Sequence, residues 1–243
     1  MSSPEDRSDE DRSGPIAWLR WFATTEEGTA AYVRDVLTSA GAVVLVGLVL
    51  FGVSGIWPPM VAVESPSMTP HMKTGDLVFV MEEHRFAPGA AYEDTGIVTA
   101  EIGDDTGYEK FKQSGDVIVF RPDGSDLETP IIHRARFWVG DGENWYDEAN
   151  PEFLAGADNC AELANCPAPH AGLITKGDAN PQYDQVGVSA ISEPIRPSWV
   201  IGTAEFRIPW LGWVRLAFSE AAAGAVAIGT VRRTRFAGQT TEV

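Results

Sequence analysis

An uncharged apolar run near the start of the chain, from Val36 to Trp57, limits the folds open to this sequence. It reads VLTSAGAVVLVGLVLFGVSGIW, 22 residues without a charge. As an α-helix rising about 1.5 Å per residue, it is long enough to cross a hydrocarbon core of roughly 30 Å. Trp57 and the Pro58-Pro59 pair suit the end of such a helix at a membrane interface. The run begins deeper in the chain than an ordinary secretory signal, so we expect an uncleaved transmembrane anchor at 36–57 rather than a buried core helix.

The segment 1–35, which precedes this run, is expected to be a cytoplasmic tail. Residues 1–13 are polar and highly charged, without an apolar face, so we predict that they are disordered. Arg12, Arg20 and Arg34 precede the anchor, and positive charge favours the cytoplasmic side of a membrane. We therefore expect a protein integral to the cell membrane, with the domain after the anchor outside the cytoplasm.

The composition is strongly acidic, with a formal net charge of -17. Such a charge disfavours binding to nucleic acids or to anionic lipids. The chain has few lysines and many carboxylates, alanines, glycines and valines. This pattern is typical of proteins adapted to high salt, where screening weakens the repulsion between like charges. The alternative interpretation is an acidic protein from a cell of ordinary salt content.

Residues 58–207 are predicted to form a β-rich domain. Five short apolar or alternating stretches, bounded by Gly, Pro and Asp, predict strands: DLVFVM, GDVIVF, PIIHRARFWV, GLITKG and WVIGTAEFRI. Two turn-rich stretches, 82–114 and 141–171, are predicted to be insert loops. The predicted fold class is therefore mainly β, with one N-terminal transmembrane helix.

The two cysteines of the chain, Cys160 and Cys166, lie six positions apart in the second insert. If this segment is outside the cell, they can close a small disulfide loop. Two free thiols are the alternative. A zinc site is not expected, because no pair of histidines stands at ligand spacing beside these cysteines.

The end of the chain, residues 208–231, is predicted to associate with the membrane. A second transmembrane helix, an interfacial helix and a soluble helix all stay open. The apolar part Leu216–Val231 spans only about 24 Å as a helix, and Glu220 within it is costly in a bilayer. The tail 232–243 opens with arginines, as a return to the cytoplasm requires, and then becomes polar.

A serine in the stretch VESPSMTPHMKTGDLVFV, Ser67, is the candidate nucleophile. Serine is a weak nucleophile until a neighbouring base takes its proton. His133 stands inside an apolar strand-like stretch, whereas Lys73, close to the serine, is expected to point to solvent. The loop LITKGDANPQYDQ supplies Asp178 and Asp184, and either carboxylate can orient an imidazole and stabilise its cation. Taken alone, His133 could equally be interpreted as a buried core residue without a catalytic role, and the loop with the two aspartates as an ordinary turn.

Three further stretches follow this serine in order: GDVIVFRPDG with PIIHRARFW, then LITKGDANPQYDQ, then FRIPWLGWV. Together with SPSMTPHMKTGDLVFV they resemble the motifs of the type I signal peptidases, in particular the archaeal and endoplasmic-reticulum branch. The acidic composition resembles that of a haloarchaeal member. The resemblance covers about half of residues 60–215 and leaves out the inserts and both termini.

This resemblance implies a signal-peptidase-like catalytic domain, to which the apolar stretches of the sequence add an N-terminal transmembrane helix and a C-terminal membrane helix. Ser67 takes the position of the nucleophile. His133 takes that of the general base, where the bacterial branch has lysine. Asp184 matches the acidic residue that completes a Ser-His-Asp arrangement, and Asp178 matches a supporting or alternative partner.

The resemblance also assigns residues around the nucleophile. Ser65 matches a position that helps to form the oxyanion hole in bacterial relatives, with the Ser67 N–H as the other donor. Met68 is expected to add apolar surface where substrate binds. Ala179 is a departure, since the archaeal motif usually has asparagine there, and it leaves the hydrogen bonds of that loop open.

The implied function is that of a membrane-bound serine endopeptidase that removes signal peptides from exported preproteins and cleaves after small residues. Its expected partners are preproteins, the lipid bilayer and the secretion translocon, with no nucleic acid, no metal and no organic cofactor. A self-cleaving or repressor-processing serine protease is a weaker alternative, because its chemistry requires a lysine at position 133. Another alternative is a membrane-anchored binding or structural domain with an inactive peptidase fold.

Overall fold

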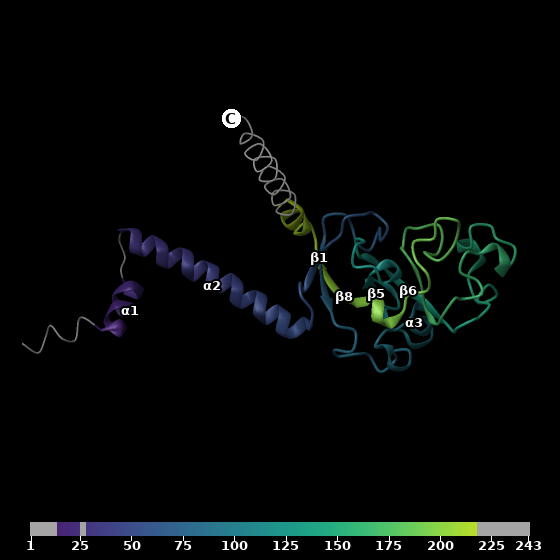
Figure 1. Cartoon of the computed structure of the whole chain (residues 1–243), viewed down its shortest axis with the longest axis horizontal. Helices are drawn as coiled ribbons and strands as arrows, with labels where there is room; N and C mark the ends of the chain where they lie inside the picture. The colour runs from purple at the N-terminus through teal and green to yellow at the C-terminus, as the bar shows by residue number, and fades with distance from the viewer. Residues whose placement is uncertain (1–13, 25–27, 218–243) are drawn as a thin grey trace, which may run out of the picture. The chain divides into compact units, whose positions relative to one another are not determined.

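The protein is described from a computed structural model that covers residues 14–24 and 28–217, except for the side chains of residues 17–19. The chain divides into two compact units, Met1–Gly52 and Val53–Val243. The first unit contains α1, Pro15–Thr24, and most of α2, Gly28–Ser54 (Figure 1). The second unit contains the β-sheet and the inserts.

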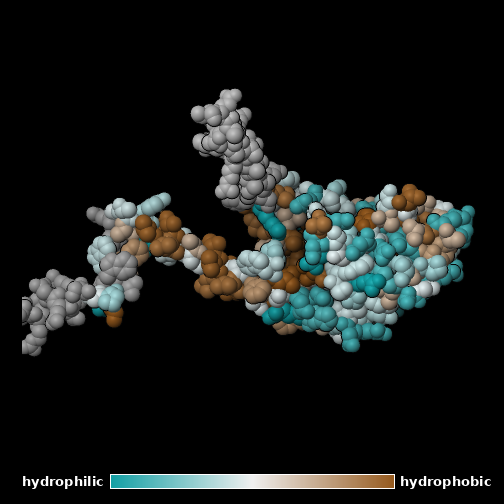
Figure 2. All heavy atoms as spheres, viewed as in Figure 1, coloured by the Kyte–Doolittle hydropathy of each residue, from teal (hydrophilic) through white to brown (hydrophobic). Residues whose placement is uncertain are grey.

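Helix α2 has 27 residues, equivalent to about 40 Å of helix. Among the described residues it is the one helix long and apolar enough to cross a membrane, with a mean hydropathy of 2.5 over its 18-residue window. Figure 2 shows hydrophobic residues gathered along this helix, whereas the visible face of the second unit is mostly hydrophilic. The helix is compatible with a membrane anchor or with a signal sequence.

The bounds of α2 differ from those of the predicted anchor at 36–57. The helix begins eight residues earlier, at Gly28, because alanines and other helix-compatible residues precede the apolar run. It ends at Ser54, since Gly55 adopts a φ of +82°, a left-handed conformation that terminates helices. Trp57 therefore lies beyond the helix rather than in its last turn.

A six-stranded antiparallel sheet forms the centre of the second unit, with the strand order β1-β2-β8-β5-β6-β7. Five of the strands coincide with the five stretches predicted from the sequence. The short edge strand β1 was not predicted. The bounds are β1 Met60–Ala62, β2 Leu77–Met81, β5 Val117–Phe120, β6 Ile131–Val139, β7 Gly172–Lys176 and β8 Val200–Ile208.

Strand β5 shows how the core is divided. All four of its residues are buried, and alternate side chains point to opposite faces of a strand. Val117 and Val119 join one apolar cluster with residues of the Ser67 loop and β2. Ile118 and Phe120 join another cluster with Ile97 and residues of β6 and β7. The sheet is thus covered on both faces, which explains the continuous apolar runs in its strands.

The first insert, predicted to be a loop at 82–114, contains regular structure. It holds a 3-10 turn η3, Glu93–Thr95, the helix α3, Ala100–Thr106, and a hairpin of β3, Glu109–Lys110, with β4, Gln113–Ser114. The Thr99 side chain caps α3 by accepting from the Ile102 N–H, and Gly107 ends it with a φ of +75°. A helix of seven residues is too short to show a helical repeat in the sequence, which is why this insert read as a loop.

The second insert, 141–171, contains 3-10 turns but no longer element. The turns of this insert are η5, Pro151–Phe153, and η6, Cys160–Glu162. Two other 3-10 turns lie outside it: η4, Pro122–Gly124, and η7, Pro197–Trp199. Trp145 is fully buried in an apolar cluster that the insert shares with β6, β7 and Tyr183. Cys160 and Cys166 form a disulfide. The insert is therefore a small packed layer rather than an open loop.

The predicted membrane segment 208–231 lies mostly outside the described residues, as do the tails 1–13 and 232–243. Up to Ala217, where the description ends, the structure contains no long C-terminal helix, and only residues 212–217 are helical. The fold as described is thus mixed: one antiparallel sheet, one long N-terminal apolar helix and short helices in the loops.

Candidate active site

Ser67 lies in the loop between β1 and β2, on a tight turn held from below by two methionines. The Met72 N–H donates to the Met68 carbonyl at 2.9 Å, and the Thr69 N–H donates to the Pro66 carbonyl at 3.0 Å. Met68 and Met72 are fully buried in the apolar cluster beneath the loop. Met68, expected to add substrate-binding surface, instead anchors the turn that presents Ser67.

His133 and Asp184 complete a chain of hydrogen bonds with this serine. His133 lies on β6 opposite Ile118 of β5 and is 3% exposed. Its Nε2 is 3.0 Å from the Ser67 Oγ, and its Nδ1 is 2.6 Å from the Asp184 Oδ2. Asp184 lies in the loop after β7, where its backbone N–H donates to the Thr175 carbonyl at 2.9 Å. Three segments far apart in the sequence therefore place a serine hydroxyl, an imidazole and a carboxylate in line.

The geometry fixes the protonation pattern of His133. A carboxylate can only accept, so neutral His133 carries its proton on Nδ1 and points the lone pair of Nε2 at the Ser67 hydroxyl. The other oxygen of Asp184, Oδ1, is buried and is the one buried side-chain polar atom without a hydrogen-bond partner in the described chain. A carboxylate left partly unsatisfied is stabilised when His133 becomes a cation, which is the step a general base must make.

Thr175, on β7, is a site residue that the sequence did not single out. Its hydroxyl donates to the Asp184 Oδ2 at 2.7 Å, and its side chain is fully buried. Gln185 lies against the same threonine, with its Oε1 accepting from the Thr175 N–H at 2.9 Å. The position of Thr175 in the stretch LITKGD, two residues before Gly177, is the only sign of it in the sequence.

Ser65 lies next to the nucleophile, with 3.0 Å between its hydroxyl oxygen and that of Ser67. The Ser67 N–H donates no hydrogen bond to any other described residue. A hydroxyl and a free backbone N–H on the same turn are two donors suited to a developing oxyanion. The predicted oxyanion residues are thus brought together beside the nucleophile.

Asp178, the other candidate orienting residue, does not contact His133. Its two carboxylate oxygens accept from the guanidinium of Arg134, Oδ1 from Nε and Oδ2 from Nη2, both at 2.9 Å. Its Oδ2 also lies 2.9 Å from the His71 Nδ1. Of the two aspartates left open by the sequence, Asp184 therefore faces the imidazole of His133, whereas Asp178 belongs to a separate buried network. Neither Arg134 nor the pairing of His71 was predicted.

The loop after β7 also touches the nucleophile directly. The Ala179 N–H donates to the Ser67 carbonyl at 2.8 Å. A Cβ on Gly177 would lie 2.8 Å from the same carbonyl oxygen, so a side chain at this position cannot be accommodated without moving the loop. The departure at Ala179 leaves this contact intact, because the backbone supplies it.

Lys176 is the lysine closest in sequence to these contacts, and its environment makes it structural. Burial lowers the pKa of its ammonium, and the charge of Arg136 acts in the same direction. Its Nζ nevertheless donates to the Gly177 carbonyl at 2.9 Å and to the Asn180 carbonyl at 2.8 Å, and lies over the ring of Phe153. These contacts use the ammonium to shape the 177–180 loop.

A cleft of about 620 Å³ opens beside Ser67 and His133. Its walls come from β1, from the start of β6, from the loop after β7 and from the end of the described chain, and they combine apolar side chains with polar ones that include Glu64 and Arg215. Besides Ser65, Ser67 and His133, the lining includes Val61, Ala62, Val119, Pro130, Ile131, Ile132 and Asn180. The cleft runs along the outer edge strand β1, where the Met60 carbonyl accepts a hydrogen bond from the Arg215 guanidinium.

One group of possible metal ligands occurs among the described residues, formed by Glu82, Glu83 and His84. Both ring nitrogens of His84 are already engaged, Nδ1 with the Glu82 carboxylate and Nε2 with the Asp94 carbonyl. This group shares no residue with the cleft or with the Ser67–His133–Asp184 arrangement. It therefore has no part in the chemistry of that site.

Comparison with known proteins adds no evidence on the candidate site. Comparison of the sequence with models of protein families found no match. Comparison with curated proteins found no match either. The assignment of a function to this chain thus depends on the arrangement of its own residues.

Proposed function

We propose that the protein is a serine endopeptidase in which Ser67 is the nucleophile, His133 the general base and Asp184 the residue that orients the base. The observation that carries this proposal is the continuous pair of hydrogen bonds, 3.0 Å from Ser67 to His133 and 2.6 Å from His133 to Asp184. Both residues of the second pair are almost fully buried. Such an arrangement is found where a serine must be activated for acyl transfer.

In the first half of the reaction, the Ser67 Oγ attacks the carbonyl carbon of the scissile peptide bond while its proton passes to the His133 Nε2. Asp184 stabilises the imidazolium that results. The tetrahedral intermediate then expels the amine, which takes the proton from Nε2, and leaves an ester on Ser67. In the second half, water attacks this ester with His133 again as the base, and the carboxylate product departs.

The negative charge of the tetrahedral intermediate requires donors that are in place beforehand. The Ser67 N–H and the Ser65 hydroxyl are the two candidates, since both lie on the nucleophile turn. Loss of one such donor typically lowers kcat by about 10²- to 10³-fold. Ser65 must turn its hydroxyl hydrogen from the Ser67 Oγ toward the oxyanion as the charge develops.

We further propose that the substrates are signal peptides of exported preproteins, as in type I signal peptidases. Three observations support this: the motif resemblance, the apolar helix α2 and the cleft beside Ser67, part of whose wall is apolar. Ser67 follows the last residue of α2 by 13 positions, at most about 45 Å of extended chain. If α2 is a membrane anchor, it keeps the catalytic domain at the surface from which a preprotein emerges. The lipid bilayer and the translocon are then its partners, and cleavage after small residues is what the resemblance implies.

Replacing Ser67 with alanine tests the proposal. Without a nucleophile, preprotein cleavage should fall by at least about 10³-fold, to the level that binding and oxyanion donors alone provide. The measurement is cleavage of a radiolabelled preprotein by the full-length protein in proteoliposomes at high KCl. The matched control is Ser189→Ala, an exposed serine of the chain, which should cleave at the parent rate. Cleavage by Ser67→Ala at the parent rate would disprove the proposal.

Replacing Thr175 with valine should reduce kcat roughly tenfold, equivalent to about 1.4 kcal/mol. Valine keeps the volume of threonine but removes the donor to Asp184, so the carboxylate is held less firmly against His133. Steady-state kinetics with a signal-peptide substrate measure kcat and KM separately, and KM should not change. Thr203→Val on β8 provides the control, since this buried threonine donates to Glu205 instead. An unchanged kcat in Thr175→Val would contradict the role of this hydroxyl.

A further inference from the structure

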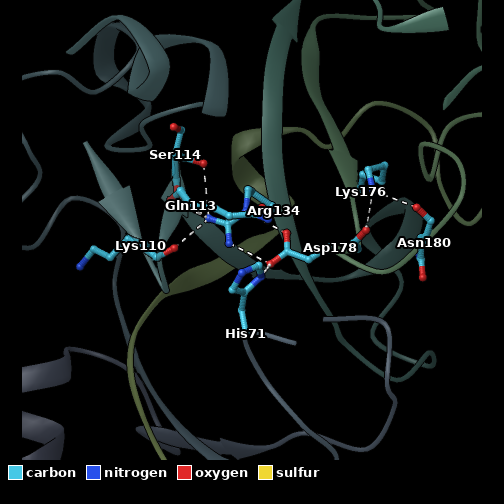
Figure 3. Close-up of polar contacts among 10 residues, drawn as sticks. His71, Lys110, Gln113, Ser114, Arg134, Lys176, Asp178 and Asn180 are labelled. Carbon is cyan, nitrogen blue, oxygen red and sulfur yellow. Dashed lines mark hydrogen bonds and ion pairs between the residues drawn. The ribbon is translucent and has the colours of Figure 1, made fainter. Parts of the chain in front are cut away.

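A fully buried arginine next to the general base organises the polar interior of the second unit (Figure 3). Arg134 follows His133 on β6, and its side chain is 0% exposed. Its Nε and Nη2 are bonded to Asp178. Its Nη1 points at backbone carbonyls of the β3–β4 hairpin and its flank, with the shortest contacts at 2.8 Å to Gly115 and 3.1 Å to Lys110. Each of the three guanidinium nitrogens therefore donates to at least one acceptor within the protein.

Asp178 connects this arginine to the nucleophile turn. Its side chain is 1% exposed, so its charge depends on the groups around it rather than on water. The next residue, Ala179, donates its N–H to the Ser67 carbonyl. The position of Asp178 is thus transmitted to Ser67 through a single peptide unit.

His71 makes a second connection between the same two segments. It lies four residues after Ser67 on the nucleophile turn, and its Nδ1 is 2.9 Å from the Asp178 Oδ2. Its side chain is 14% exposed, and it does not line the cleft. Since Arg134 already neutralises Asp178, charge balance does not require His71; its contribution is a directed donor. Hydrogen bonds therefore hold the turn at both ends, between Ser67 and Ala179 at its start and between His71 and Asp178 at its end.

We infer that His71 is a positioning residue, which through its hydrogen bond to Asp178 holds the Ser67 turn at the distance from His133 that proton transfer requires. This inference rests on the proposed function, because it concerns the same nucleophile and base. His71 touches neither substrate nor reacting atoms; it acts through the turn. A misplacement of about 1 Å at a reacting group can cost on the order of 10²-fold in rate, so loss of this fastening should lower kcat and leave KM unchanged.

The test measures the Ser67–His133 pairing without requiring peptidase activity. In a Ser67→Cys background of the full-length protein in detergent micelles, the new cysteine is the one free thiol, because Cys160 and Cys166 are joined. A thiol beside an imidazole loses its proton below the usual pKa of about 8.5. The pH dependence of its alkylation by iodoacetamide therefore reports the distance between positions 67 and 133.

Two substitutions separate the donor from the packing, since leucine keeps most of the volume without the donor and asparagine keeps a donor in a smaller side chain. His71→Leu removes the hydrogen bond to Asp178, and the alkylation midpoint should rise toward about 8.5, by roughly one pH unit. His71→Asn places an amide N–H near the position of Nδ1 and should restore the parent midpoint. His84→Ala, at an exposed histidine of the first insert, should leave it unchanged. If tryptophan fluorescence shows that the leucine variant does not fold, His71→Ala replaces it.

The outcomes are distinct. Three results would each overturn the positioning role. The first is an equal alkylation midpoint in His71→Leu and the parent, and the second is a parent midpoint near the usual thiol pKa of about 8.5. The third is failure of His71→Asn to restore the parent midpoint. In the background with Ser67 intact, the leucine variant should lower kcat for preprotein cleavage by about ten- to a hundredfold, with the same KM. If the parent cleaves no preprotein, the proposed function fails, while the alkylation profile still decides the role of His71.

Discussion

Replacing Asp184 with asparagine should lower kcat for preprotein cleavage about 10⁴-fold, the size of effect seen when a triad carboxylate becomes an amide. An amide carries no charge to stabilise the His133 cation. It can also donate to Nδ1, which would place the imidazole proton on Nε2, facing Ser67. The other oxygen of Asp184 is buried without a hydrogen-bond partner among the described residues. KM should hardly change, because Asp184 does not line the cleft.

The measurement is single-turnover cleavage by the full-length protein, in which product release does not limit the rate. Asp141→Asn, in an exposed position of the second insert, is the matched control and should retain the parent rate. Asp178→Asn serves as a comparison with Asp184→Asn, because Asp178 contacts Arg134 and His71 rather than His133. A loss of less than tenfold in Asp184→Asn would contradict its assignment as the orienting residue.

Replacing Arg134 with methionine should lower the free energy of unfolding by about 3–5 kcal/mol, the cost of removing one partner of a buried ion pair. Methionine fills much of the same space, but it leaves the Asp178 carboxylate, 1% exposed, with His71 as its remaining side-chain partner. The carbonyls of Gly115 and Lys110 lose their donor as well. Because stabilities of folded domains are about 5–15 kcal/mol, this change removes a large share of the total.

The loss is measured by urea unfolding of the full-length protein in micelles, followed by tryptophan fluorescence. Arg136→Met is the matched control, two residues along the same strand. Arg136 is half-buried and no ion pair or hydrogen bond of its side chain occurs in the described part of the chain, so its loss should cost at most about 0.5 kcal/mol. The difference between the two variants should persist between low and high KCl, because salt screens buried pairs little. Equal stability of the two variants would refute the role of Arg134.

The sequence carried enough information for five of the six strands of the sheet and for the residues of the proposed triad. Strands such as VIVF in β5 are apolar throughout and could be predicted individually, whereas the edge strand β1 and the order of the strands in the sheet could not. Ser67, His133 and Asp184 each stand in a stretch with a chemical reason for that residue type. What the sequence could not decide was which carboxylate meets His133. Asp178 and Asp184 lie six residues apart in one turn-rich loop, and only the path of the chain after β7 separates their directions.

The residues that sequence reasoning missed are those whose role depends on what lies across the fold. Arg134 was not singled out in the sequence, because its partners come from the β3–β4 hairpin and its flank and from the loop after β7. The β3–β4 hairpin was not predicted either. Its turn residues Phe111 and Lys112 adopt positive φ angles of 54° and 67°, and glycine or asparagine is the residue type that usually indicates this conformation in a sequence. Met68 was expected to add substrate-binding surface, but its side chain is fully buried. An apolar residue at this position in the sequence fits a core as well as a substrate surface.

The contact between Ala179 and Ser67 has a consequence for the evolution of this site. The contact uses the main-chain N–H of Ala179 alone, and the residue is exposed. Nearly every amino acid presents the same donor at this point, so selection on the nucleophile turn places little demand on which side chain stands there. Proline is the exception, since it has no N–H to give. A substitution at position 179 other than proline therefore leaves this contact with Ser67 in place, and is by itself poor evidence of a change in catalysis.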